Sequence, residues 1–161
     1  MLALSLMALS LATGALGSVQ TQEEALTPAA APTSSGPSWN LVSRSSSTAF
    51  MTDVNGIRQQ DGITTAQLAR VPTSGDAADQ THSVSEVSFR CSANQAKTGE
   101  EVYYAADGSV EERITNDFDF EPIPANSLDA YTKAIVCGGE RTARSFPSIA
   151  AFIAAGRPIR D

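Results

Sequence analysis

The chain has 161 residues and a formal net charge of −7, from 18 acidic and 11 basic side chains. A chain this acidic is repelled by phosphate backbones and anionic membrane surfaces, which excludes nucleic acid as an expected partner. The length is that of one folded domain with a modest core.

Residues 1–17 have the pattern of a signal peptide. The apolar run from Leu2 to Leu16 is too short to cross a bilayer comfortably, and Ala15 and Gly17 stand at the −3 and −1 positions of a cleavage site before Ser18. We therefore expect Sec-dependent export to the periplasm, the cell surface or the medium. Membrane contact is expected only through this segment if it stays uncleaved. No cysteine lies near it, which argues against a lipid anchor.

Residues 18–38 form a linker rich in Pro, Ala, Ser and Thr. Such a composition has little apolar surface to bury, so we expect a flexible spacer before the domain at residues 39–161.

From Trp39 onward, apolar residues recur mainly with period two, which predicts β-strands. Tight turns are expected at Asn55-Gly56, Asp61-Gly62 and Asp107-Gly108. The six predicted strands are residues 39–42, 49–54, 63–71, 82–91, 101–106 and 109–115. Short strands joined by such turns indicate an antiparallel meander.

The period changes near the end of the chain. Ser127 is expected to cap a helix that ends at Cys137, before Gly138-Gly139. Its apolar stripe is predicted to be Leu128, Tyr131, Ala134 and Ile135. A second helix is predicted over 147–155, with Ile149, Phe152 and Ile153 as its apolar face. The predicted fold class is α+β: a six-stranded antiparallel sheet (meander) with the C-terminal helices packed on one of its faces, and one disulfide.

The disulfide prediction rests on Cys91 and Cys137, the two cysteines of the chain. An even count in an exported chain favours a disulfide, here one between the end of a strand and the end of a helix. The alternative is a nucleophilic or metal-binding thiol. A catalytic pair would need His82, the single histidine, which is nine residues from Cys91. On one strand that spacing is roughly 30 Å, too far for a pair.

Other candidate chemistry is weak. Asp117, Asp119 and Glu121 alternate with Phe118 and Phe120. The carboxylates could bind calcium or act in acid–base catalysis, but bulky aromatics between them favour a strand-like segment with phenylalanines inward and charges outward.

The acidic pairs Glu100-Glu101 and Glu111-Glu112 are expected to be solvated. Tyr103 and Tyr104 should point to opposite faces of their strand. One is expected in the core, and the other is either a binding aromatic or a cross-strand packing residue. We expect no catalytic residue, no metal and no cofactor, and the binding residues stay unassigned.

With these elements in place, the domain resembles the surface-adhesin protein E family of Gram-negative bacteria over about Trp39 to Cys137. The motifs that carry the resemblance are Trp39, Phe50-Met51-Thr52-Asp53, Ile57, Asp61-Gly62, Cys91, Val102-Tyr103-Tyr104, Asp107-Gly108, Pro122-Ile123-Pro124, Ser127 and Cys137. The resemblance implies a six-stranded sheet tied to a C-terminal helix by a disulfide. It also implies adhesion to host matrix and plasma proteins, and dimerisation. The chain departs from the family in having no lipobox cysteine and in its tail, 140–161.

The function expected is therefore a non-catalytic binding protein of the cell envelope, not an enzyme. Its partner would be a protein, either of the host matrix or of the envelope, and a homodimer is a further expected form. The alternative is a periplasmic inhibitor or stress-related protein acting on an envelope enzyme, such as a basic cell-wall hydrolase attracted by the acidic surface. A hydrolytic enzyme is a distant third hypothesis.

Overall fold

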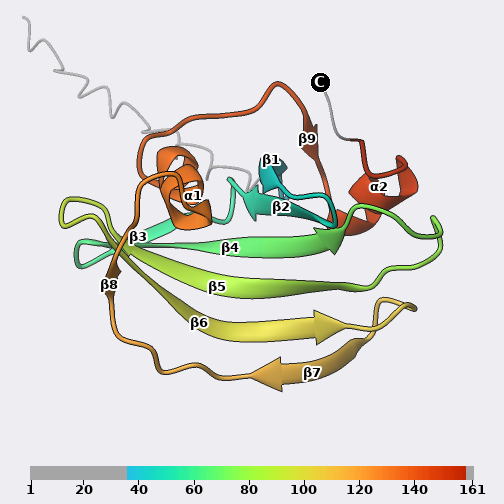
Figure 1. Cartoon of the computed structure of the whole chain (residues 1–161), viewed down its shortest axis with the longest axis horizontal. Helices are drawn as coiled ribbons and strands as arrows, with labels where there is room; N and C mark the ends of the chain where they lie inside the picture. Colours follow the sequence, from blue (N-terminus) through green and yellow to red (C-terminus); the bar gives the residue numbers. More distant parts are fainter. Residues whose placement is uncertain (1–35, 159–161) are drawn as a thin grey trace, which may run out of the picture. The chain divides into compact units, whose positions relative to one another are not determined.

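A computed structural model describes residues 36–158 (Figure 1). They form one antiparallel sheet of nine strands in the order β7-β6-β5-β4-β2-β1-β9, with β3 beside β4 and β8 beside β6. The strands are β1 (Trp39–Arg44), β2 (Thr48–Asp53), β3 (Arg58–Gln60), β4 (Ile63–Pro72), β5 (His82–Arg90), β6 (Gln95–Tyr104), β7 (Val110–Ile114), β8 (Glu121–Pro122) and β9 (Ser145–Phe146). The helices are α1 (Leu128–Val136) and α2 (Ile149–Ala154). The predicted signal peptide, and the predicted linker up to residue 35, lie outside the described residues.

The antiparallel meander is confirmed, but the prediction of six strands is wrong. The three additional strands, β3, β8 and β9, are only two or three residues long. Strands this short contain too few residues to show the alternation of apolar and polar residues that identifies a strand in a sequence. In addition, β6 begins at Gln95 and not at the predicted Glu101. Its first half has Ala96 as its one apolar residue and a register shift against β5, so the period-two pattern is lost there.

The sheet has two cores, one on each face. In β4, Leu68 belongs to one core and its neighbour Ala69 to the other. Because successive side chains of a strand point to opposite faces, the two cores lie on opposite sides of the sheet. The buried residues of the α1 core are Ala66, Leu68, Val87, Phe89, Ala96, Ile123 and Val136. Those of the α2 core are Trp39, Ala49, Met51, Ala69, Val71, Ile149, Phe152 and Ile153.

The two helices therefore cover opposite faces, and the prediction of helices on one face is wrong. α1 contributes Val136 to one core, while α2 contributes Phe152 and Ile153 to the other. Each helix is short, with nine residues in α1 and six in α2, so neither extends across its whole face. Part of each face of the sheet remains without a helix above it.

The predicted start of α1 is confirmed, but its predicted apolar stripe is only partly right. The Ser127 hydroxyl accepts a hydrogen bond from the Ala130 amide at 3.1 Å, as expected of an N-cap. Tyr131 is 46% exposed. The buried position is the next residue, Thr132, whose hydroxyl donates to the Leu128 carbonyl at 2.8 Å and so needs no other partner.

The described part of the tail, residues 140–158, returns to the sheet. β9 pairs with the first two residues of β1, Trp39 and Asn40. The predicted second helix is confirmed as α2, with all three predicted apolar residues buried. Beyond it, Arg157 is 5% exposed and donates to the carbonyls of Gly75, Asp76 and Asp79 at 2.9–3.1 Å, which fastens the loop between β4 and β5. No helix within residues 36–158 is long and apolar enough to cross a membrane.

Candidate functional site

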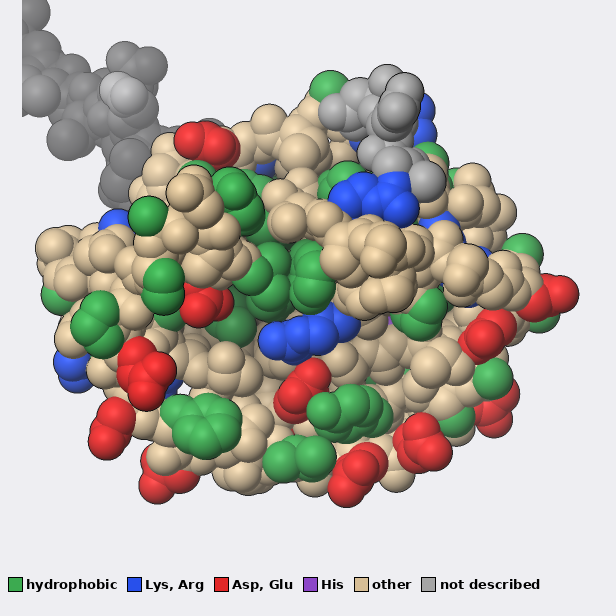
Figure 2. Space-filling view, in the orientation of Figure 1, with side chains coloured by type: hydrophobic (Ala, Val, Ile, Leu, Met, Phe, Trp, Pro, Cys, Tyr) green, Lys and Arg blue, Asp and Glu red, His purple; other side chains and the backbone are tan. Residues whose placement is uncertain are grey.

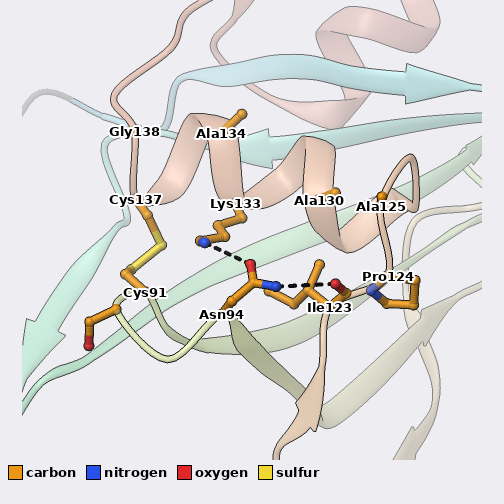
Figure 3. Close-up of a pocket in the computed structure, with 11 residues that line it drawn as sticks. Cys91, Asn94, Ile123, Pro124, Ala125, Ala130, Lys133, Ala134, Cys137 and Gly138 are labelled. Carbon is orange, nitrogen blue, oxygen red and sulfur yellow. Dashed lines mark hydrogen bonds between the residues drawn. A yellow bond between two sulfur atoms is a disulfide. The ribbon is translucent and has the colours of Figure 1, made fainter.

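The predicted disulfide is present in the structure (Figure 3). Cys91 follows the end of β5, Cys137 is the C-cap of α1, and their sulfur atoms are 2.04 Å apart. The bond therefore joins the sheet to the helix that covers it, as the sequence predicts.

A groove of about 740 Å³ lies beside this disulfide, between α1 and the 123–125 segment (Figure 3). Its polar side chains form hydrogen bonds that join separate segments of the fold. Lys133 Nζ donates to Asn94 Oδ1 at 2.8 Å, and Asn94 Nδ2 donates to the Ile123 carbonyl at 3.2 Å. Asn94 has a φ of 53°, a left-handed conformation that asparagine tolerates better than most residues. These bonds tie α1 to the β5–β6 turn, and the rest of the groove is formed largely by Ile123, Pro124 and alanines.

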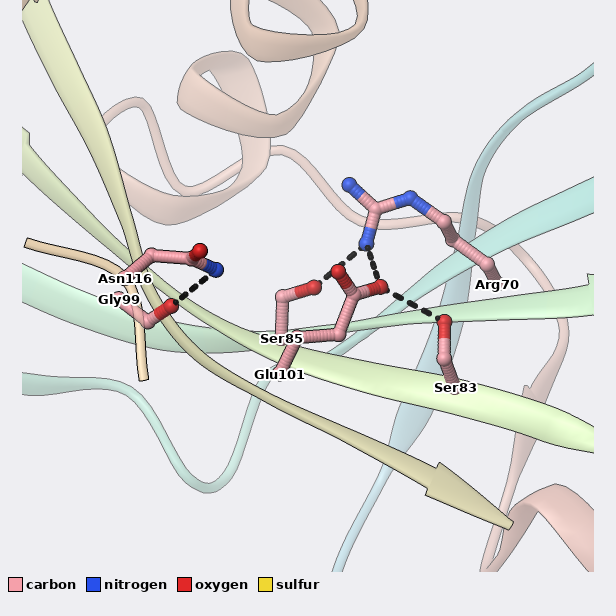
Figure 4. A network of polar contacts seen from close by, with 6 residues as sticks. All are labelled: Arg70, Ser83, Ser85, Gly99, Glu101 and Asn116. Atoms are coloured by element: carbon pink, nitrogen blue, oxygen red, sulfur yellow. Dashed lines mark hydrogen bonds and ion pairs between the residues drawn. The ribbon is translucent and has the colours of Figure 1, made fainter. Parts of the chain in front are cut away.

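A polar network occupies the part of the α1 face that α1 leaves uncovered (Figure 4). Arg70 of β4 forms an ion pair with Glu101 of β6 at 3.1 Å. Between them, on β5, Ser83 donates to Glu101 Oε1 at 3.0 Å and Ser85 accepts from Arg70 Nη1. The register explains the grouping, because Arg70 is opposite Ser83 and Ser85 is opposite Glu101 on one face.

Small residues at the centre of this network let the large ones lie over the sheet. Ser85 is fully buried although neither α1 nor α2 covers it, and the side chains of Arg70 and Glu101 are 33% and 17% exposed. Both bonds of the guanidinium use Nη1. The pair is thus held in place by Nη1 alone, while the other terminal nitrogen is directed away from Glu101 (Figure 4).

Two aromatic residues stand on either side of the network. Phe50 of β2 and Tyr103 of β6 line a hollow of about 390 Å³ together with Arg70 and Ser83. The hydrogen bond to the Glu101 carboxylate raises the pKa of Tyr103, and partial desolvation acts in the same direction. We call this surface the open face: Phe50, Arg70, Ser83, Ser85, Glu101 and Tyr103.

The structure does not bring the single histidine to a cysteine. His82 begins β5, whereas Cys91 lies beyond its far end and is used in the disulfide. The His82 ring stacks on Tyr104 with centroids 4.3 Å apart, and its Nδ1 is 2.6 Å from the Gln80 carbonyl. That carbonyl can only accept, so Nδ1 carries the proton. Burial lowers the pKa of His82.

The acidic–aromatic segment was predicted to be strand-like with its phenylalanines inward, and for Phe118 this is wrong. Phe118 is 59% exposed, and only Glu121 of the three carboxylates lies in a strand, the two-residue β8. Phe120 lies under the guanidinium of Arg90, 4.1 Å from the ring centroid. A cation–π contact takes the place of the core packing that was expected.

Two further predictions fail at the same end of β6. Glu101 was expected to be solvated but is mostly buried in the ion pair with Arg70. Tyr103 and Tyr104 point to opposite faces, but neither is in a core and both are only partly buried. The tyrosines are only partly buried because neither helix packs directly on this end of the strand. Glu101 is buried because it pairs with Arg70 over the sheet. Within residues 36–158, no group of three His, Cys, Asp or Glu residues could hold a metal ion.

The sequence did not predict the network, and Glu101 was expected only to be solvated. Arg70 interrupts the apolar run of β4, and Ser83 and Ser85 precede Val87 and Phe89 on one face of β5. These polar positions could have indicated the network: serines on the same face of a strand as core residues show where the core on that face ends. Their pairing with Glu101 depends on the register of β6 against β5, which the sequence did not predict.

Comparison with known proteins adds the family. A sequence model of the family described as surface-adhesin protein E matches residues 39–138. The match spans more than half of the chain, which therefore belongs to this family. Comparisons with curated proteins and with solved structures give no match.

Proposed function

We propose that this member of the surface-adhesin protein E family is an exported, non-catalytic protein of the bacterial cell envelope that binds a protein partner through its open face. One observation supports this location: the Arg70–Glu101 network lies on a part of the sheet that neither α1 nor α2 covers. Aromatic residues around a fixed charged pair are the composition of protein-binding surfaces.

Export is supported by two features of different kinds. Residues 1–17 have a signal-peptide pattern, and the domain contains a disulfide, which persists in oxidising compartments. The proposed location is the periplasm or the cell surface, with residues 18–38 as a spacer.

The partner class follows from charge and from the family. The chain carries a net charge of −7, and Figure 2 shows acidic side chains along the lower edge of the face in view, where β7 lies in Figure 1. Such a surface disfavours nucleic acid and favours a protein with basic groups. Host matrix proteins and envelope proteins are both candidates, and a homodimer is a further form to be tested.

The test compares the exported full chain with two variants in binding to purified extracellular-matrix proteins and to purified envelope proteins. Arg70→Met and Tyr103→Ala are expected to reduce binding at least about tenfold, as central charged and aromatic contacts do. Arg58→Met is the matched control, because it removes the same charge from the exposed strand β3. Equal binding by all four proteins would overturn the proposed surface, and no binding to any partner would overturn the proposed function.

A second candidate is inhibition of a basic cell-wall hydrolase, favoured by the acidic edge along β7. Inhibition of a panel of lysozymes by the full chain is the readout. Inactivity against every member removes this candidate.

A further inference from the structure

We propose that a cavity between α2 and the sheet binds one basic side chain, Lys or Arg, presented by a partner protein. The cavity has a volume of about 480 Å³ and lies on the face opposite the open face. Its size is within the range of ligand sites, and its lining is apolar at one end and acidic at the other.

The apolar end suits the alkyl stem of a long basic side chain. Val84 and Val102, paired across β5 and β6, form the floor, and Trp39 and Ile149 stand at the α2 side. The stacked rings of His82 and Tyr104 also line the cavity. Aromatic and aliphatic walls bind methylene groups, and aromatic faces attract a cation.

The acidic end supplies the charge. Glu100 accepts from Arg113 Nη1 at 2.9 Å, and these two charges cancel. Glu86 forms no ion pair within residues 36–158, and its Oε1 lies over Gly99, where an added Cβ would be 3.4 Å away. His82, with its pKa lowered by burial, adds no positive charge at neutral pH. The cavity therefore has one net negative charge, which matches one cation.

The tail builds one wall of this site. Ser148, Ile149 and Ala150 line the cavity, and all three follow residue 138, where the family match ends. The inference rests on the proposed function only in that the ligand belongs to a protein. It concerns the other face of the sheet, so the two proposals are tested by different residues.

The cavity contains its own reporters. Trp39 is the single tryptophan of the chain and His82 the single histidine, so the emission of Trp39 and the NMR resonances of the His82 ring both report on its occupancy. The full chain is titrated with the Nα-acetyl methylamides of lysine and arginine. The matched probe is the norleucine derivative, which has the same apolar stem as lysine without the charge.

We expect saturable changes with the basic probes, at least about tenfold weaker affinity for the norleucine derivative, and weakening with added salt. Glu86→Gln should lower the affinity for lysine about tenfold, whereas Glu111→Gln, the same change on exposed β7, should leave it unchanged. Equal affinity for lysine and norleucine, an unaffected Glu86→Gln variant, or no response of either reporter would overturn the proposal. Arg70→Met should bind the probes normally, so a failure of the open face and a failure of this cavity give different results.

Discussion

Leu68 and Ala69 are neighbours in β4, yet their side chains enter different cores on opposite faces of the sheet. At this point the buried side of the strand changes, from the face covered by α1 to the face covered by α2. The arrangement gives the domain two small cores, one on each face of the sheet, and leaves part of each face uncovered by α1 and α2.

Leu68→Ala should lower the free energy of unfolding by about 2–4 kcal/mol, because Leu68 is only 1% exposed and its truncation leaves a cavity in the α1 core. Urea unfolding followed by Trp39 emission measures the change. Gln67→Ala, one position away and exposed, is the control and should stay within about 0.5 kcal/mol. Similar losses in both variants would contradict the assignment of faces.

Replacing both cysteines by alanine should cost about 4 kcal/mol, the chain-entropy value for a separation of 46 residues. Denaturant unfolding of the oxidised protein and of the double variant gives the difference. A thiol assay on the unfolded, non-reduced protein should find no free thiol, and two free thiols would show that the bond does not form.

Glu101→Gln should lower the pKa of Tyr103 toward the usual tyrosine value, because the Glu101 carboxylate is the main cause of its elevation. Ultraviolet absorbance of tyrosinate during an alkaline titration measures it, with Tyr103→Phe to identify the transition. Glu112→Gln should have a smaller effect, since Glu112 contributes least to the shift. An unchanged titration in Glu101→Gln would place the carboxylate elsewhere.

His82, the single histidine of the chain, predicts how the stability of the domain changes at mildly acidic pH. Burial holds the pKa of His82 below its ordinary value of 6.5, so the unfolded chain binds the proton more readily than the folded one. Stability should therefore fall as the pH drops below about 6.5 and toward the lower folded pKa. NMR titration of the ring gives that pKa. His82→Gln should flatten this part of the stability profile, and a pKa of 6.5 or above would refute the prediction.

Arg157→Met should destabilise the domain by about 2–3 kcal/mol and loosen the loop between β4 and β5, since three carbonyls lose a charged donor. Amide hydrogen exchange at residues 75–80 reports the loop, and urea unfolding reports the domain. Arg157→Lys should not restore protection, because a single ammonium cannot reproduce the fork of the guanidinium. Unchanged exchange in both variants would show that the contact is incidental.

Much of the fold was predictable because local signals and burial agree. The Asp61-Gly62 turn adopts positive φ values of 51° and 77°, as a tight hairpin turn requires, and Ser127 caps α1. Cys91 and Cys137 were paired correctly because the chain has two cysteines and therefore one possible intramolecular disulfide. The long strands β4 and β5 kept their alternation and were found.

The remaining features depend on tertiary context. Nothing near Gln95 marks the true start of β6, which is formed by pairing with β5 and β8. The network of Arg70 and Glu101 joins residues that are 31 apart in the chain, through a register that only the folded sheet defines. α1 and α2 lie on opposite faces because each covers a different exposed apolar part of the sheet. The apolar residues of a helix show that it packs on a sheet, but they do not show on which face.

The tail has a consequence for where this domain ends as a folding unit. Trp39 opens the segment that the family shares, yet it is 7% exposed only because Phe146, Phe152 and their neighbours pack beside it. Expressed alone, residues 39–138 would present the side chains of Trp39, Met51 and Val71 to water as one continuous apolar patch, and such patches promote aggregation. In this chain the region that matches the family is therefore shorter than the region that must fold as one unit.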